Sequence, residues 1–203
     1  MMINKVGTDE KVIAITFDDG PNPIFTPEIR KIFQEANAKA TFFMIGEQME
    51  KSPELVKVLS EQGHEIGNHT YHHVNLTELT EEECLKEIKE NEKYIQKLTG
   101  KIPKVLRPPF LAQNERTNQL VSNLGYSIIG ALNMDATDWE MPGVDFILRK
   151  TRKHVQNGAI LIFHDGYGDR NQTIEAIRQL VPEIQQQGYK LVTVSELIEQ
   201  SYR

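Results

Sequence analysis

The sequence contains a single cysteine, Cys84, so no disulfide within the chain can stabilise its fold. It has no apolar run approaching the roughly 20 residues that a membrane span needs. Residues 1–10 contain neither the apolar segment nor the small-residue cleavage site of a secretory leader. We therefore expect a cytoplasmic protein for the chain as written, or a secreted or cell-wall-associated one if a leader was removed.

Positive charge is also scarce, because 23 Lys and Arg face 29 Asp and Glu and leave a net charge of -6. Nucleic acids are bound by concentrated Lys and Arg, so we do not expect a nucleic-acid partner. A neutral or weakly charged substrate fits this balance better. The chain has 203 residues, 39% hydrophobic and 26% charged, which is typical of a globular protein. We expect residues 1–203 to form a single domain.

Short apolar runs alternate with helical patterns along the whole chain. The expected strands are 13–17, 40–45, 64–68, 105–106, 126–129, an extended piece at 131–134, 159–163 and 189–192. The expected helices are 26–38, 53–63, 81–99, 117–124, 144–154, 173–187 and a terminal helix capped by Ser195 and Glu196. This alternation predicts an α/β fold with a parallel sheet, either closed into a barrel or wound as an open sheet.

Polar side chains follow five of the predicted strands. These groups are Asp18 with Asp19, residues 69–73, Arg107, residues 135–139 and His164. In a β/α barrel the carboxyl ends of the strands share one face, and active sites are built there. We therefore expect the five groups to meet at one mouth of the sheet.

Two histidines, His69 and His73, lie four residues apart, a spacing that puts both imidazoles on one side of a helical turn. With Asp19 they make a set of two nitrogens and one oxygen, which leaves coordination positions open as in catalytic zinc sites. His72 is the alternative ligand, because spacing does not exclude it. The expected cofactor is a divalent metal, with Zn²⁺ first and Co²⁺, Ni²⁺ or Fe²⁺ as alternatives.

Asp18 is adjacent to Asp19 but outside the expected ligand set, so it can take the proton from an attacking water. Arg107 can orient Asp18 and keep it ionised through a charge-assisted pair. His164 follows a buried strand and is the expected general acid, because an unperturbed imidazole titrates at about 6.5. Asp138 is expected to hold the protonated ring of His164.

Other residues near these groups have expected roles outside the proton transfers. Trp139 and Ile162 are expected to wall a small apolar pocket. His64 and His154 lie in or beside helix ends, and we expect both to be structural. Asp165 lies in a glycine turn after His164 and is expected to be a turn residue.

Together these motifs resemble the polysaccharide deacetylase family, the NodB-homology domain of carbohydrate esterase family four. The family's five motifs occur in order as TFDDG at 16–20, HTYHH at 69–73, RPPF at 107–110, DATDW at 135–139 and LIFHD at 161–165. The resemblance implies a distorted (β/α)7 TIM-like barrel. It also implies metal-dependent removal of acetyl groups from N-acetylglucosamine-containing poly- or oligosaccharides of the chitin or peptidoglycan type, or from acetylated xylan.

The resemblance implies the same site residues as the spacing does. By position, Asp19, His69 and His73 match the family's metal ligands, Asp18 matches its base and His164 its acid. Arg107 and Asp138 match the residues that tune the base and the acid. Phe110 falls where the family uses a backbone N–H to stabilise the oxyanion. The third motif departs from the pattern Arg-Pro-Pro-Tyr-Gly, because Phe110 and Leu111 follow the prolines, which implies a bulkier loop without a tyrosine hydroxyl.

Three other functions are compatible with parts of this pattern. An O-acetyl esterase acting on xylan would use the same site, because esters and amides pass through the same kind of oxyanion. A non-catalytic glycan-binding barrel would be expected to lack a ligand or the base, and all of them are present. Two histidines and a carboxylate also ligate iron in oxygenases, but those folds are usually antiparallel. We therefore expect a hydrolase acting on an acetylated glycan.

Overall fold

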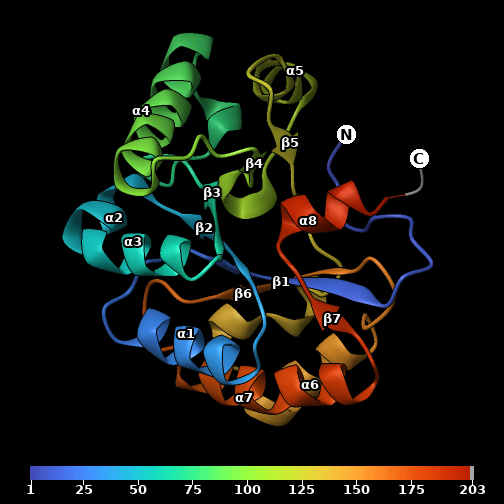
Figure 1. Cartoon of the computed structure of the whole chain (residues 1–203). Coiled ribbons are helices and arrows are strands. Elements are labelled where there is room, and N and C mark those ends of the chain that lie inside the picture. Colours follow the sequence, from blue (N-terminus) through green and yellow to red (C-terminus); the bar gives the residue numbers. More distant parts are fainter. Residues whose placement is uncertain (202–203) are drawn as a thin grey trace.

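The buried apolar runs of the sequence become the strands of one parallel sheet, shown in Figure 1. The structure is a computed structural model and describes residues 1–201. The strands are β1 Val12–Asp18, β2 Thr41–Met44, β3 Glu65–Asn68, β4 Val105–Leu106, β5 Ser127–Ile128, β6 Ile160–His164 and β7 Lys190–Leu191. Their order is β5-β4-β3-β2-β1-β6, and β7 pairs with the start of β1.

The sheet curls because β1 has different neighbours along its length. β7 pairs with its first two residues, whereas β2 pairs with its last three and β6 with its last five. The N-terminal segment bridges the gap between β5 and β6. The Ile3 N–H donates to Ile128 O (2.8 Å), and the Ile160 N–H donates to Asn4 O (3.3 Å). The result is the distorted seven-stranded β/α barrel that the sequence predicts.

Helices cover the outer surface of this barrel (Figure 1). They are α1 Phe25–Glu35, α2 Gly46–Lys51, α3 Pro53–Glu61, α4 Glu81–Thr99, α5 Glu115–Asn123, α6 Val144–Arg152, α7 Asn171–Gln186 and α8 Val194–Glu199. Short 3₁₀ helices lie in the loops at η1 Leu76–Glu78, η2 Pro109–Leu111, η3 Met134–Ala136 and η4 Asp138–Glu140. Within residues 1–201, every helix is too short or too polar to cross a bilayer.

The longest helix, α4, has the ends that the sequence predicts. The Thr80 hydroxyl accepts from the Glu83 N–H, and the Glu83 carboxylate accepts from the Thr80 N–H (2.8 Å). Gly100 ends the helix with a φ of 72°, a conformation that costs glycine little. Both signals are local, so they are readable without tertiary information.

Four helices do not begin as predicted, and one of them, α7, begins at Asn171, two residues before the predicted start at 173. Thr26 lies inside α1 instead of capping it, and its hydroxyl is used by Asp165 in the tertiary structure. Helix α5 begins two residues before the predicted Thr117, because Asn114 caps it. Helix α8 is capped by Thr193 and not by Ser195. Thr26 and Ser195 have the chemistry of a cap, but each forms its hydrogen bond with a distant acid, Asp165 for Thr26 and Glu65 for Ser195.

Two further segments differ from the prediction. Residues 131–134 form no strand of the sheet: the Leu132 N–H donates to Ile160 O (3.0 Å), and η3 begins at Met134. Helix α2 was not predicted, because its six residues carry no clear cap or apolar period. Its first residue, Gly46, packs so closely on Tyr71 that a Cβ there would lie 2.3 Å from the ring.

Alternation along β1 decides which side chains reach the inside of the barrel. Ile13, Ile15 and Phe17 belong to the core shared with α1 and α7. The intervening residues face the other way, so that Thr16 and Asp18 share the inner face with Arg107. The last inward residue of β1 is thus an acid at the carboxyl mouth of the barrel.

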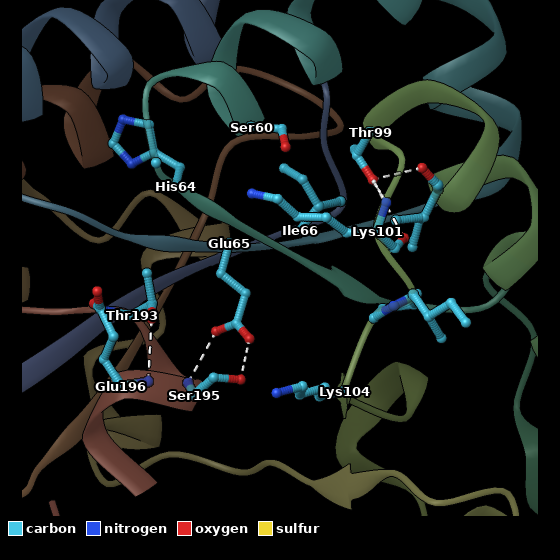
Figure 2. A pocket seen from close by; sticks show the side chains of 14 residues that line it. Ser60, His64, Glu65, Ile66, Thr99, Lys101, Lys104, Thr193, Ser195 and Glu196 are labelled. Atoms are coloured by element: carbon cyan, nitrogen blue, oxygen red, sulfur yellow. Dashed lines mark hydrogen bonds between the residues drawn. The ribbon is translucent and has the colours of Figure 1, made fainter. Parts of the chain in front are cut away.

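At the opposite, amino end of β3, a cavity of about 430 Å³ lies between α8 and the loop after α4 (Figure 2). Glu65 points across it toward Ser195 and accepts from both the N–H (3.0 Å) and the hydroxyl of Ser195. Its carboxylate also accepts from the Thr41 hydroxyl (2.9 Å). These bonds tie α8 to the sheet, which explains why Ser195 is not a cap.

Candidate active site

The predicted site residues meet at the carboxyl mouth of the barrel. Asp18 and His164 end β1 and β6 and are partners in the register of these strands. His69 follows the last residue of β3, and Arg107 follows β4. A cavity of about 530 Å³ opens at this mouth, within the ~300–1,000 Å³ typical of ligand pockets. Its lining residues are Asp18, Asp19, His73, Phe110, Leu111, Met134, Trp139, Ile162, His164 and Tyr167.

Asp19, His69 and His73 each offer one ligand atom, and these three atoms lie within 4.8 Å of one another. Asp19 Oδ1 is 3.4 Å from His69 Nε2 and 3.2 Å from His73 Nε2. The other ring nitrogen of His69, Nδ1, lies 2.6 Å from the carbonyl oxygen of Arg107. Because a carbonyl only accepts, Nδ1 carries a hydrogen, and Nε2 can direct a lone pair toward Asp19.

These residues fit a divalent cation. Asp19 Oδ1 is buried and accepts no hydrogen bond from the described residues, so it faces two ring nitrogens without a donor. Burial raises the pKa of Asp19, but protonated rings of His69 and His73 hold that pKa well below its usual range, and a cation would take the place of those protons. An ionised oxygen beside two nitrogens is the donor set of a catalytic zinc site with open positions.

The spacing argument for the histidines was wrong in its local geometry. Residues 69–73 form a loop instead of a helical turn, and Thr70 and His73 have positive φ values of 64° and 56°. Two buried amide side chains hold this loop, one from β3 and one from α4. Asn68 Oδ1 accepts from the Thr70 N–H (2.9 Å), and the Asn91 amide donates to Thr70 O (2.8 Å). The two imidazoles converge through this backbone conformation and not through helical periodicity.

His72, the alternative ligand, lies outside the cluster. Its Nδ1 is 2.6 Å from Glu87 Oε1, and this hydrogen bond raises the pKa of His72. Glu87 also accepts the backbone N–H groups of Tyr71 and His72 through Oε2 (3.0 and 2.9 Å). A buried acid on α4 therefore turns His72 away from Asp19 and braces the loop that carries His69.

Asp18 is paired with a fully buried arginine. Arg107 Nη1 donates to Asp18 Oδ1 and to the Thr16 hydroxyl, both at 2.7 Å. Nη2 donates to Gly130 O (2.7 Å), and the guanidinium carbon lies 4.3 Å from the centre of the Phe43 ring. Burial lowers the pKa of Arg107, and Asp18 opposes that shift. The pair fixes one oxygen of Asp18 and leaves Oδ2 on the side of His69, 3.8 Å from Nε2.

His164 is held by Asp138 from η4. His164 Nδ1 lies 2.8 Å from Asp138 Oδ1, and the backbone N–H of His164 donates to Asp138 Oδ2 (2.9 Å). The Thr173 hydroxyl donates to the same Oδ2 (2.9 Å). Burial opposes protonation of His164, but the charge of Asp138 raises its pKa above the usual range. Because Nδ1 is engaged by Asp138, Nε2 is the nitrogen available to a bound molecule.

The predicted apolar walls line the cavity on the His164 side. Trp139 and Ile162 both border it, and the Trp139 ring lies edge-on to His164 with centroids 5.2 Å apart. Phe110 borders the cavity on the His73 side, with ring centroids 4.8 Å apart. Sequence reasoning missed Leu111, Met134 and Tyr167 as lining residues.

Asp165 is more than a turn residue, which corrects the prediction. It is fully buried, and its Oδ2 accepts from the Thr26 hydroxyl at 2.5 Å. The Asp165 N–H donates to Asp18 O (3.1 Å), and a Cβ at Gly20 would lie 2.5 Å from the carboxylate. Burial raises the pKa of Asp165 to about 7. This side chain therefore fastens the turn that carries Asp18 and Asp19 onto α1 and β6.

Two other histidines lie away from the site. His64 is buried, and its Nδ1 accepts from the Ala40 N–H (3.1 Å). His154 pairs with Asp135 (3.0 Å) on the outer side of α6, so the first acid of the DATDW motif does not enter the cavity. Both histidines have hydrogen bonds that stabilise the local fold.

The chain matches one family model and is similar in sequence to named deacetylases. The family model described as polysaccharide deacetylase matches residues 5–129. The chain is 40% identical over 195 residues to a peptidoglycan-N-acetylglucosamine deacetylase of Bacillus cereus, covering 96% of this chain and 91% of the relative. It is 31% identical to a chitooligosaccharide deacetylase of Azorhizobium caulinodans, covering 92% and 94%.

Solved structures agree with the fold. A crystal structure of a peptidoglycan N-acetylglucosamine deacetylase, in complex with 4-naphthalen-1-yl-N-oxidanyl-benzamide, superposes with a TM-score of 0.92 at 31% identity. The match covers 98% of this chain and 92% of that one. The similarity therefore includes all seven strands and the mouth of the barrel.

Proposed function

This chain belongs to the polysaccharide deacetylase family, and from that premise we propose that it hydrolyses the acetamide of N-acetylglucosamine units in a poly- or oligosaccharide. The observation that carries the proposal is the cavity in which Asp18, Asp19, His73 and His164 meet beside His69. N-acetylglucosamine is the unit common to the substrates in the names of the two relatives. We also propose that residues 1–203 form one domain, because strands from the whole chain share one sheet.

Asp19, His69 and His73 are the proposed ligands of a divalent metal, with zinc first because two nitrogens and an oxygen suit it. When bound, such an ion lowers the pKa of a water and polarises the acetyl carbonyl. The proposed contribution of the chain is the ligand geometry: the Arg107 carbonyl selects the tautomer of His69, and Glu87 and Asn91 hold its loop.

Asp18 is the proposed general base. Its Oδ1 is occupied by Arg107 Nη1, whereas Oδ2 lies near the ligand cluster and can take a proton from the attacking water. The buried guanidinium fixes the orientation of the carboxylate, as a base requires. Arg107 is thus a positioning residue that acts through Asp18.

His164 is the proposed general acid. Asp138 favours the protonated ring and directs Nε2 away from itself, so His164 can donate a proton to the departing amine. An amine leaving group needs this proton more than an alcohol does. Trp139 and Ile162 provide the apolar wall against which an acetyl methyl group fits, and the Phe110 N–H is the proposed donor to the oxyanion.

The direct test is Asp18→Asn, which keeps the size of the side chain but removes the base. We expect this variant to bind one equivalent of zinc, as measured by metal analysis, and to release acetate from chitotetraose at least about 100-fold more slowly than wild type. Asp19→Asn is the matched comparison, because it should lose zinc as well as turnover. Acetate release by Asp18→Asn at the wild-type rate would contradict the proposal.

The bond cleaved is tested by comparing substrates. Rates of acetate release from chitotetraose, a peptidoglycan fragment and acetylated xylan are measured with the same zinc-loaded protein. We expect the two N-acetylated substrates to be preferred, and His164→Ala to slow them more than the ester, since an alkoxide leaves with less assistance. Faster turnover of acetylated xylan would instead assign an O-acetyl esterase.

A further inference from the structure

The mouth of the cavity presents large apolar side chains to solvent. Phe110, Trp139 and Tyr167 line it and are 70%, 38% and 45% exposed. Trp139 is explained by its contact with His164, but nothing in the proposed chemistry requires the rings of Phe110 and Tyr167. Exposed apolar groups gathered at one place mark binding surfaces.

Backbone conformation holds these two rings where they are. Phe110 and Tyr167 have positive φ values of 59° and 49°, which non-glycine residues rarely adopt because they strain the backbone. The loop of Tyr167 is further tied by Arg170, which donates from Nε to Gly166 O (2.8 Å) and from Nη1 to Trp139 O (3.3 Å). Strained residues of this kind persist where the surrounding structure fixes them, and they gather at ligand sites.

The two rings flank the same histidine. The His73 ring lies 4.8 Å from the Phe110 ring and 5.9 Å from the Tyr167 ring, measured between centroids. His73 is one of the three residues of the proposed metal cluster, so both aromatics lie beside the place where the scissile acetamide would be bound. They come from loops after β4 and β6, on different parts of the barrel mouth.

The chemistry of the lining favours an uncharged ligand. Among the described residues, neither lysine nor arginine lines this cavity, whereas two acids do. The Tyr167 hydroxyl forms no hydrogen bond within residues 1–201, so it is free to bond a sugar hydroxyl. A pyranose ring has an apolar face of C–H groups and an equatorial rim of hydroxyls, and a flat aromatic ring with a phenol complements both.

Resting on the proposed function, we infer that Phe110 and Tyr167 form an aromatic subsite that stacks on a neutral pyranose ring next to the scissile acetamide. The subsite selects glycans with more than one sugar, because one ring must lie at the ligand cluster and a second ring must lie on the aromatics. Tyr167 is the specificity-determining residue of this subsite, since it supplies both a face and a hydroxyl.

Binding is measured first, without turnover. Trp139 is the only tryptophan of the chain and lies in the site, so its fluorescence reports ligand. Chitotetraose is titrated into chelator-treated wild type, Tyr167→Ala, Tyr167→Phe and Phe110→Ala. We expect the dissociation constant to rise about tenfold in both alanine variants, and Tyr167→Phe to stay within about threefold of wild type. Ile102→Ala is the control and should leave the dissociation constant unchanged, because Ile102 is exposed and lines the separate cavity at the amino end of β3.

Activity is then measured with zinc-loaded proteins. Tyr167→Ala should raise the KM for chitotetraose about tenfold with kcat within about threefold, because the residue binds the sugar and takes no part in the proton transfers. Equal binding and KM in Tyr167→Ala and wild type would overturn the subsite while leaving the deacetylase in place. Tyr167-dependent binding in a wild type that releases no acetate would retain the subsite and overturn the proposed function.

Discussion

Removal of the Arg107 side chain should destabilise the protein more than any surface change. In Arg107→Met, the buried carboxylate of Asp18 loses its ionic partner, and the Gly130 carbonyl and Thr16 hydroxyl each lose a 2.7 Å hydrogen bond. Arg107 is fully buried, so water does not replace these bonds. Removing one member of a buried ion pair costs roughly 3–5 kcal/mol.

We therefore expect the free energy of unfolding to fall by about 4 kcal/mol, a large share of the roughly 5–15 kcal/mol of a typical domain. Urea unfolding of the metal-free protein, followed by circular dichroism and by Trp139 fluorescence, measures this loss. The slope against urea should stay unchanged if the variant still unfolds in one step.

A double-mutant cycle assigns the effect to the pair. In the Asp18→Asn background, Arg107→Met leaves no unpaired charge, so its cost should shrink to about 2 kcal/mol. A loss below about 1 kcal/mol in the single variant, or an equal loss in both backgrounds, would refute the reasoning that Arg107 stabilises the ionised base.

Two further predictions concern buried groups around the barrel. Thr26→Val should lower the free energy of unfolding by about 1–3 kcal/mol, because the buried Asp165 carboxyl group loses its hydrogen-bond donor. Urea titrations at pH 6 measure this loss. In an Asp165→Ala background, Thr26→Val should cost much less. Burial lowers the pKa of His64 from 6.5 to about 4, so its stabilising contribution is present above pH 6.5 and is lost as the pH falls toward 4. Between pH 7.5 and 4.5, wild type should lose about 2.5 kcal/mol more than His64→Asn, and parallel curves would contradict this.

Local patterns in the sequence were sufficient for most elements of the fold, with α2 and residues 131–134 as the exceptions. The apolar run at 159–163 predicted the buried strand β6, and the Thr80 capping box and Gly100 predicted both ends of α4. These signals are readable because each depends on residues within one turn or one strand. Parallel topology then placed Asp18 and His164 at one mouth, because the carboxyl ends of parallel strands share a face.

The sequence by itself therefore determined the seven strands, most of the helices, the barrel they build and the residue types that gather at its mouth. The sequence also predicted the pairs Arg107–Asp18 and Asp138–His164, but only the tertiary structure showed which further groups hold the site residues in place. Glu87 on α4 turns His72 away and the Arg107 carbonyl orients His69, while Thr26 binds Asp165, 139 residues away. Such contacts depend on how close distant segments come after folding, and that distance leaves no periodic or local trace in the chain.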